Sequence, residues 1–323
     1  MPGGTHGISP TGRYSPLRYP GGKGKLSKFM VSIVRANGLS DGRYIEPYAG
    51  GAGIAWELLI TGVVRRVLIN DISPHLFSFW TSVLNHTDDL CQRIREAPLS
   101  VDEWDRQKEI FRRPDDVSTI ELGFSCFYLN RTNRSGILNA GLIGGRNQAG
   151  KWRIDARFNR ENLIHRIMKI AECAGRIEVS CADAVDFLRE KSGGLGKNDL
   201  IYVDPPYFEK GRMLYYDAYR PDDHTAMAEL LAELKGLSWV VSYDDVDAIR
   251  SLYAFAPRLH YRIGYSARNR TRGREVMFFS KSMSVPKLVS PLQEASGLED
   301  DGRSVAEIGY VEAADYGLAT RQA

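Results

Sequence analysis

The segment DLIYVDPPYFEK (199–210) constrains the fold of this chain more than any other. Its apolar run is typical of a buried strand. Two prolines follow, and proline ends a strand because it lacks an N–H donor and has a fixed φ. We therefore expect Asp204 at the carboxyl end of a buried strand, with Tyr207 and Phe208 on a rigid loop beyond it.

Predicted strands and helices alternate along most of the chain. The strands are expected at 43–47, 65–70, 176–180, 199–204, 238–243, 258–265 and 274–280. The helices between them are expected at 23–36, 54–60, 159–172, 183–190 and 221–234. This alternation predicts an α/β fold with a doubly wound, mainly parallel sheet. The 323 residues, 43% of them hydrophobic, are enough for one large α/β domain with an insertion.

The region between the second and third strands is too long and too helical for a simple crossover. Apolar residues spaced near 3.6 predict helices through 75–130, and five glycines predict a loop or hairpin at 131–156. We interpret 76–171 as an inserted, mostly helical subdomain, and 15–75 with 172–282 as the sheet domain. Apolar periodicity fades after that, so 283–323 is predicted to be a flexible tail.

The net charge of +3 says little about partners, but its distribution is uneven. Residues 131–170 hold nine basic residues against two acidic ones, and 258–281 hold seven against one. Two such blocks suggest a surface that faces phosphates. Two solvated basic faces are the alternative interpretation.

No apolar run reaches transmembrane length, and the polar amino terminus does not resemble a signal peptide. The four cysteines, at 91, 126, 173 and 181, lack C-x-x-C spacing. Reduced thiols are therefore expected rather than a disulfide or zinc site. We predict a cytoplasmic protein without a membrane partner.

The glycine-rich turn YAGGAG (48–53) follows the first predicted strand, and Asp71 follows the second. In open α/β sheets, ligands bind beyond the carboxyl ends of the strands, and glycine lets the backbone approach them closely. An acid at Asp71 could accept hydrogen bonds from a ribose diol. The spacing is not G-x-G-x-x-G, which weakens a dinucleotide interpretation, and any βαβ unit offers a similar turn.

The DPPY segment gains a chemical role if the cofactor is S-adenosylmethionine. The exocyclic amine of adenine is a poor nucleophile because its lone pair is conjugated into the ring. Asp204 could accept one N6–H hydrogen bond and the Pro205 carbonyl the other, which exposes the lone pair by positioning and electrostatics. Tyr207 would stack on a flipped-out base, and Phe208 would wall the pocket. A D-P-P sequence alone is more simply a strand-ending turn.

Taken together, these segments resemble the Dam-like group of N6-adenine DNA methyltransferases over about residues 15–282. The matching motifs are LRYPGGKGKL (17–26), YIEPYAGG (44–51), LINDISPHL (68–76), FYLNRTNRSGIL (127–138), SCADAVDFL (180–188) and VDPPYF (203–208). The chain departs from the group at Ala184, where an aromatic residue is expected.

The resemblance implies a class I methyltransferase fold, Rossmann-like, with a target-recognition insertion. It implies methyl transfer from S-adenosylmethionine, without a metal, to N6 of a flipped-out adenine at a specific site in duplex DNA. The implied catalytic residues are Asp204, Pro205, Pro206 and Tyr207. The implied cofactor-binding residues are Tyr19, Lys23, Glu46, Tyr48, Gly50, Asp71, Asp183 and Asp204. The implied DNA contacts are Arg131, Asn133, Arg134, Arg146 and Lys151.

Two alternatives stay open. An adenine of RNA or the N4 amine of cytosine offers similar chemistry, although Asp before Pro-Pro-Tyr favours adenine by resemblance. A non-catalytic DNA-binding relative is the other, against which the intact DPPY segment and Lys23 argue. The resemblance also implies a bacterial or phage enzyme that is a monomer, with room for a cognate restriction endonuclease.

Other polar and aromatic residues receive simpler interpretations. We expect His224 to cap a helix or lie on the surface. Trp56, Trp80 and Trp239 lie in apolar periodic runs and are predicted to be core. Trp104 and Trp152 lie in the polar insertion, and Trp152, beside Lys151 and Arg153, is predicted to be packed, with a DNA contact as the alternative.

Overall fold

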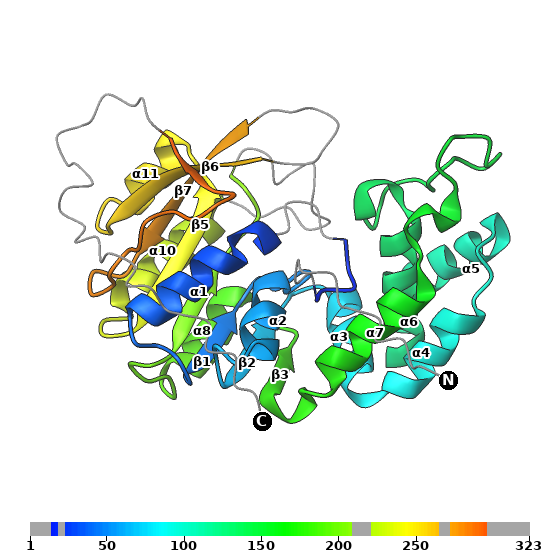
Figure 1. Cartoon of the computed structure of the whole chain (residues 1–323), viewed down its shortest axis with the longest axis horizontal. Helices are drawn as coiled ribbons and strands as arrows, with labels where there is room; N and C mark the ends of the chain where they lie inside the picture. Colours follow the sequence, from blue (N-terminus) through cyan, green and yellow to red (C-terminus); the bar gives the residue numbers. More distant parts are fainter. Residues whose placement is uncertain (1–13, 19–22, 209–220, 265–271, 296–323) are drawn as a thin grey trace, which may run out of the picture.

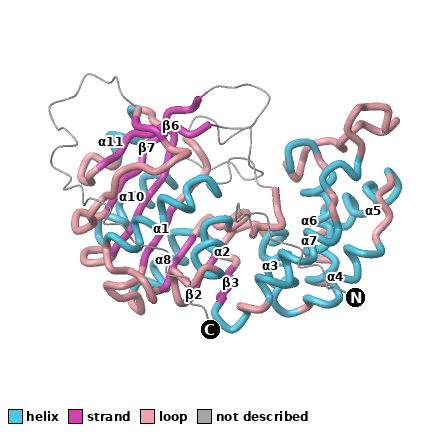
Figure 2. The backbone as a smooth tube through the Cα atoms, viewed as in Figure 1, coloured by secondary structure: helices cyan, strands magenta, loops and turns pink. Residues whose placement is uncertain are grey.

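Eight strands form one sheet in the order β3-β2-β1-β4-β5-β7-β6-β8 (Figures 1 and 2). This computed structural model describes residues 14–18, 23–208, 221–264 and 272–295. Neighbours among the first five strands run parallel, whereas β7, β6 and β8 are antiparallel to their neighbours. The strands are β1 (Arg43–Glu46), β2 (Arg66–Asn70), β3 (Ile177–Ser180), β4 (Leu200–Val203), β5 (Ser238–Asp244), β6 (Arg258–Gly264), β7 (Arg272–Phe279) and β8 (Gln293–Glu294). The predicted mainly parallel, doubly wound sheet is confirmed.

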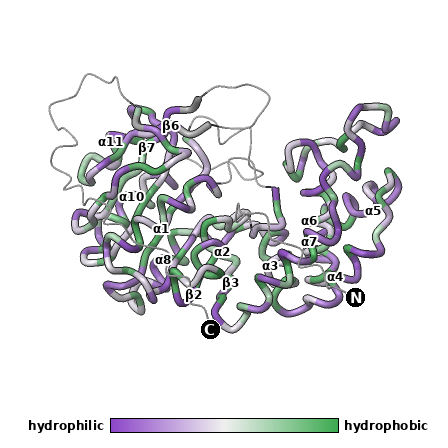
Figure 3. The backbone as a smooth tube through the Cα atoms, viewed as in Figure 1, coloured by the Kyte–Doolittle hydropathy of each residue, from purple (hydrophilic) through white to green (hydrophobic). Residues whose placement is uncertain are grey.

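Helices cover both faces of the sheet. One face carries α1 (Ser27–Ala36), which follows the 3-10 turn η1 (Lys23–Leu26), and α2 (Gly53–Ile60). The other face carries α8 (Ala184–Ser192), α10 (Pro221–Glu233) and α11 (Asp247–Leu252). Each face has its own hydrophobic core, and hydrophobic residues gather along the inner strands and α2 (Figure 3). The tryptophans predicted to be core, Trp56, Trp80 and Trp239, are at most 3% exposed.

Five helices follow β2 and make the predicted insertion, which lies beside the sheet at the right of Figure 1. They are α3 (Pro74–Asn85), α4 (Thr87–Glu96), α5 (Val101–Phe111), α6 (Thr119–Thr132) and α7 (Arg160–Ala171). Ser73 is the N-cap of α3 and Pro74 its first residue, a position that suits proline because its missing N–H would be unpaired there anyway. A capping box of Ser118 and Glu121 starts α6.

The insertion shares one continuous core with the sheet. Phe79 and Trp80 of α3 and Phe127 of α6 belong to the same buried cluster as Trp56 of α2. Gly123 allows α6 to approach α3, because a Cβ at this position would lie 2.6 Å from the Ser78 carbonyl oxygen. The insertion therefore packs on the sheet domain through a shared buried core.

Segments outside the regular helices connect this scaffold. Between α6 and α7 the chain forms the short 3-10 turns η2 (Arg134–Gly136) and η3 (Ile154–Arg157), as the predicted loop allows. A further 3-10 turn, η4 (Ala174–Arg176), precedes β3.

The start of the predicted tail is ordered on the sheet. Val285 and Leu292 are buried, and β8 pairs with β6. Residues 296–323 lie outside the described residues. In the described part of the chain, we find no helix that combines the length and apolarity needed to cross a bilayer.

Candidate active site

Asp204 lies directly after β4, at the carboxyl edge of the sheet. Its Oδ1 accepts a hydrogen bond of 2.7 Å from Ser242 Oγ on β5. The Lys23 ammonium of η1 lies 3.6 Å from the same oxygen. The side chain of Asp204 is 20% exposed, so the carboxylate is held by Ser242 and Lys23 and remains partly accessible to a ligand. This placement agrees with the expected strand end before the prolines.

Lys23 is buried in a polar network centred on Glu275 of β7. Its Nζ donates to Glu275 Oε2 at 2.9 Å and to the Tyr207 hydroxyl at 2.6 Å. Tyr207 in turn donates to Glu275 Oε1 at 2.6 Å, and the Tyr261 hydroxyl donates to Oε2. Lys23 is 6% exposed and Glu275 is 2% exposed. The network therefore fixes the DPPY loop through the hydroxyl of its tyrosine.

Burial and neighbouring charges change the proton affinities in this cluster. Burial, with a smaller contribution from the charge of Glu275, raises the pKa of Asp204 to about 6 against the lowering effects of Lys23 and Ser242. Burial opposes the charge of Lys23, but Asp204 and Glu275 outweigh it and raise the pKa of Lys23 well above its ordinary value. Near neutral pH, the site therefore holds the Lys23 ammonium beside an ionised Asp204.

The glycine-rich turn after β1 is held by the next strand. The Gly50 amide donates to Asp71 Oδ2 at 2.9 Å, and the Gly50 carbonyl accepts from Trp80 Nε1 at 3.0 Å. Gly50 and Ala52 have φ values of 49° and 47°, in the left-handed region. A Cβ at Gly53 would lie 3.7 Å from the Cα of Gly24 in η1. The turn and the Lys23 segment are therefore neighbours.

The predicted cofactor residues gather along this edge. Glu46 is buried at the end of β1 and its Oε2 has no hydrogen-bond partner. Burial raises the pKa of this carboxyl group. Tyr48 is half-buried against the second core, and the exposed Asp183 caps α8 by accepting from the amides of Val185 and Asp186. Tyr19 lies outside the described residues.

Four residues of this edge escaped the sequence analysis. Asn70 donates to the carbonyls of Pro47 and Ala182 and accepts from the Ala182 amide, so it braces the loops after β1 and β3. Ser242 contacts Asp204, and Tyr261 contacts Glu275. Glu275 is the one acid among the basic residues of 258–281, and this isolation was the sequence signal that could have singled it out.

Two predicted DNA contacts are engaged inside the protein. Asn133 is fully buried, and its amide accepts from Trp104 Nε1 and donates to the Ile137 and Leu138 carbonyls. The resemblance implied a DNA contact for Asn133, but in this structure its side chain is buried and hydrogen-bonded within the insertion. Arg131 is half-buried, and it donates to the carbonyls of Arg157 and Pro16.

Arg134, Arg146 and Lys151 are exposed on the insertion, as a DNA contact requires. Arg146 forms a two-bond ion pair with Asp105 at 2.8 and 2.9 Å, and both side chains are exposed. Trp152 was expected to be packed, but it is 58% exposed. Lys151 and Arg157 lie 5.7 and 5.4 Å from its ring, so cations rather than a core surround it.

His224 is not a surface residue. It is 2% exposed, and its Nδ1 lies 2.8 Å from the Tyr243 hydroxyl. Its ring packs against Phe208 at 5.2 Å, and the Phe208 amide donates to Asp244 Oδ1. The tertiary fold therefore uses His224 to support the loop after Pro206.

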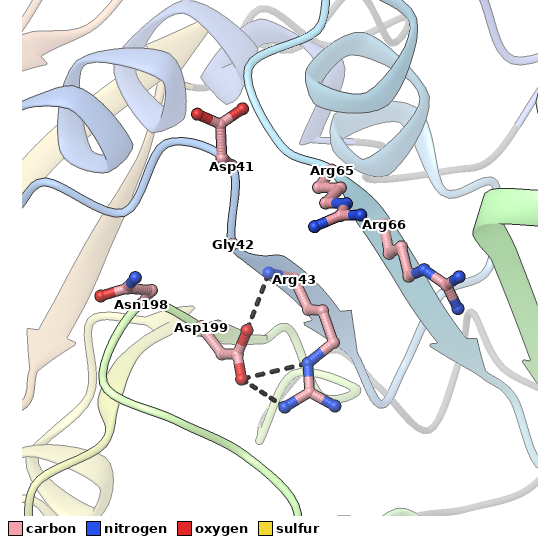
Figure 4. A pocket seen from close by; sticks show the side chains of 7 residues that line it. All are labelled: Asp41, Gly42, Arg43, Arg65, Arg66, Asn198 and Asp199. Atoms are coloured by element: carbon pink, nitrogen blue, oxygen red, sulfur yellow. Dashed lines mark hydrogen bonds and ion pairs between the residues drawn. The ribbon is translucent and has the colours of Figure 1, made fainter.

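A hollow of about 280 Å³ lies at the amino ends of β1 and β2, the opposite edge from Asp204 (Figure 4). Arg65 and Arg66 line it, and Arg43 pairs with Asp199 at 2.6 Å. This hollow is separate from the candidate site. The four cysteines are free thiols, and only Cys181 is exposed. Within the described ranges no group of three or more His, Cys, Asp or Glu side chains could hold a metal ion.

Known DNA methyltransferases are similar to this chain in sequence. A family model described as D12 class N6 adenine-specific DNA methyltransferase matches residues 19–266. The type II methyltransferase M.MjaIII of Methanocaldococcus jannaschii is 24% identical over 260 residues, which cover 73% of this chain and 86% of the relative. The retron Ec67 DNA adenine methylase of Escherichia coli is 25% identical over 219 residues, covering 65% and 72%.

The modification methylase StsI of Streptococcus sanguinis is 25% identical over 215 residues, covering 62% of this chain and 30% of the relative. The family description names adenine in DNA, so it favours that substrate over the RNA and cytosine alternatives.

Proposed function

Because the chain belongs to the D12 class N6 adenine-specific DNA methyltransferase family, we propose that Asp204 and the Pro205 carbonyl hold the N6 amine of a flipped-out adenine for methyl transfer. The observation that carries this proposal is the half-open Asp204 carboxylate, fixed by Ser242 and Lys23 at the carboxyl end of β4. Pro206 keeps the loop rigid, and Tyr207 presents its ring to the base while its hydroxyl is anchored.

The residues along the sheet edge fit S-adenosylmethionine. The unpartnered, buried Oε2 of Glu46 suits an ammonium group, and the left-handed turn at Gly50 leaves room for close approach. Asp71 would contact the ribose in addition to holding the turn, and Asp183 would lie near the adenine ring. Ile72, which is 56% exposed beside Asp71, offers an apolar surface for the same ring. Tyr19, Lys23 and Tyr48 complete the proposed set.

When bound, S-adenosylmethionine supplies an electrophilic methyl group on a sulfonium. Asp204 accepts one N6–H hydrogen bond and the Pro205 carbonyl accepts the other, which frees the N6 lone pair. That lone pair forms the N–C bond as the C–S bond breaks, and the bonding electrons stay on sulfur. The extra N6 proton then leaves to solvent. None of these steps requires a histidine or a metal ion from the chain.

A cluster of arginines on the inner side of the insertion supports duplex DNA as the substrate. Arg131 donates to the Arg157 carbonyl at 2.8 Å, and Arg18 donates to the Asn133 carbonyl at 3.3 Å. Burial and the neighbouring arginines lower the pKa of Arg131 to about 9. Across the described residues, no carboxylate pairs with Arg18, Arg131 or Arg157. A backbone phosphate would relieve this repulsion.

The antiparallel end of the sheet adds a second basic surface. Arg262 of β6 is directly opposite Arg274 of β7, the residue that precedes Glu275 in the chain. Like charges directly opposite each other destabilise a strand pair. An anionic partner at this position, such as the strand that carries the flipped base, would compensate for the repulsion.

Target recognition by 76–171, with Arg134, Arg146 and Lys151 as contacts, belongs to the same proposal. The proposal also assigns catalysis to 15–75 and 172–282. It includes a monomeric state and a cytoplasmic location in a bacterial or phage-infected cell. A cognate restriction endonuclease is a further proposed partner, in keeping with the names of the type II methyltransferase and the modification methylase.

The proposed function is tested by incubating plasmid DNA with S-adenosylmethionine and weighing the nucleosides after digestion. We expect N6-methyladenosine as the deoxynucleoside, and none with Asp204→Ala. The control is Asp186→Asn, whose side chain is 73% exposed on α8 and lies outside the proposed site. Methylated cytosine or methylated RNA would overturn the assigned substrate, and full turnover by Asp204→Ala would overturn the role of Asp204.

A further inference from the structure

Glu275 has no role in the proposed methyl transfer, yet it is the centre of the buried network beside Asp204. Both of its carboxylate oxygens are engaged: Oε1 accepts from Tyr207, and Oε2 accepts from Lys23 and Tyr261. It is 2% exposed. Burial of a carboxylate is costly unless it is paired and hydrogen-bonded, so this arrangement is a specific one.

The distances show how Lys23 is shared between two acids. Its Nζ is 2.9 Å from Glu275 Oε2 but 3.6 Å from Asp204 Oδ1. The ammonium is therefore drawn toward Glu275 and stops short of a close pair with Asp204. A close pair would give Asp204 Oδ1 a second strong partner beside Ser242 and would make the carboxylate a weaker acceptor for the N6–H hydrogen bond.

Glu275 also fixes the orientation of the DPPY loop. The Tyr207 hydroxyl donates to Oε1 at 2.6 Å and accepts from Lys23 at 2.6 Å. Lys23 lies 4.8 Å from the centre of the Tyr207 ring. One carboxylate on β7 thus holds both the catalytic loop after β4 and the lysine of η1.

We propose that Glu275 is a positioning residue for methyl transfer, which draws Lys23 away from Asp204 and anchors the hydroxyl of Tyr207. The inference rests on the proposed role of Asp204. It assigns a function to β7, which lies in the antiparallel part of the sheet. The proposed cofactor residues come mainly from the parallel strands and the loops that follow them.

The main test is Glu275→Gln, which keeps the size of the side chain and removes its charge. We expect the single-turnover rate of methyl transfer at pH 7.5 to fall at least about tenfold, because a misplaced catalytic group costs rate rather than affinity. The dissociation constant for duplex DNA is expected to stay within about threefold of wild type.

The pH profile separates positioning from a merely structural role. The charged and titratable groups that face Asp204 are Lys23 of η1, Glu275 of β7, Glu46 and Tyr44 of β1, Tyr202 of β4, and Tyr207 of the loop after β4. In Glu275→Gln, Lys23 is left with Asp204 as its carboxylate partner. The acid limb of the kcat/KM profile, which is its rise with pH at the acidic end, should therefore shift to lower pH by roughly half a unit or more. A structural role alone would lower stability and leave the limb in place.

A second variant keeps the test decisive if Glu275→Gln does not fold. Glu275→Asp retains the charge but is too short to reach Tyr207 and Lys23 together. We expect a rate loss of about fivefold with the acid limb near its wild-type position. A wild-type rate in Glu275→Asp, or an unmoved limb with a wild-type rate in Glu275→Gln, would overturn the proposal.

A double-mutant cycle tests whether Lys23 transmits the effect. In a Lys23→Met background, the Glu275→Gln change should cost much less rate than it does alone, because the ammonium that it redirects is absent. Additive losses would overturn this route. Failure of the proposed function itself would show differently, as a wild-type protein that transfers no methyl group to duplex DNA.

Discussion

Removal of the Ser242 hydroxyl should raise the pH at which the enzyme becomes active. Ser242 Oγ donates to Asp204 at 2.7 Å, and this bond stabilises the ionised carboxylate. Asp204 must be ionised to accept the N6–H hydrogen bond of adenine. Activity is therefore expected to fall as the pH drops through the pKa of Asp204, which burial raises to about 6.

The expected shift follows from the strength of that bond. A hydrogen bond to a charged group is worth about 1.5–3 kcal/mol, and one pKa unit corresponds to about 1.4 kcal/mol. Asp204 is 20% exposed, so water replaces part of the lost bond and the lower value applies. In Ser242→Ala, the pKa of Asp204 should rise by about one unit, to about 7.

The assay is kcat/KM for the cofactor from pH 5 to 9 on a duplex substrate, because this ratio reports the ionisation of the enzyme before the cofactor binds. The ratio of variant to wild-type activity should rise from about one fifth at pH 6 to about nine tenths at pH 8. Saturating cofactor should lower both midpoints, because a sulfonium charge favours the carboxylate.

Tyr202→Phe is the matched control. The Tyr202 hydroxyl lies 2.8 Å from Ser242 Oγ, and its removal leaves the bond to Asp204 in place. Both variants disturb the same buried pair of hydroxyls, but only Ser242→Ala should move the acid limb. A Ser242→Ala profile that coincides with wild type would refute the assignment of this limb to Asp204.

Three further outcomes are expected. Asn70→Ala should weaken cofactor binding about tenfold by calorimetry, because it frees the loops after β1 and β3 and leaves buried carbonyls unpaired; unchanged affinity would contradict the bracing role. Gly123→Ala should lower the free energy of unfolding by about 1–3 kcal/mol in a urea titration, whereas Gly175→Ala, which meets nothing within 4 Å, should not. Arg157→Gln should weaken duplex binding; if Arg157 contacts one phosphate, the magnitude of the slope of log K against log salt should fall by about 0.9. The control Arg66→Gln, at the opposite edge of the sheet, should leave the slope unchanged.

The parts of the fold that were predictable follow from local patterns. Alternating strands and helices and the Ser73–Pro74 helix start depend on nearby residues, and the structure agrees with them. The strand end before Pro205 was predictable for the same reason, because proline excludes a ladder hydrogen bond wherever it occurs.

The missed features depend on contacts distant in sequence. Glu275 meets Lys23 across 252 positions, and Asn133 meets Trp104 across 29, so neither environment is visible in the neighbouring residues. Asn133 belongs to a motif that resembles a DNA-contacting stretch, but burial decides what its amide can reach. His224 was misjudged similarly, because its position in the first turn of α10 does not reveal that Tyr243 covers it.

The shared core of the sheet and the insertion has a consequence for engineering sequence specificity. A chimera that exchanges 76–171 as a block would replace Phe79, Trp80 and Phe127 but keep Trp56 of α2, which packs on Trp80 at 4.8 Å between ring centroids, so apolar surfaces of the two parents would be mismatched. Grafts confined to 144–153, the exposed segment that carries Arg146 and Trp152, would leave every buried helix with its native neighbours. Libraries aimed at new target sites should therefore randomise that short segment and keep the helical frame intact.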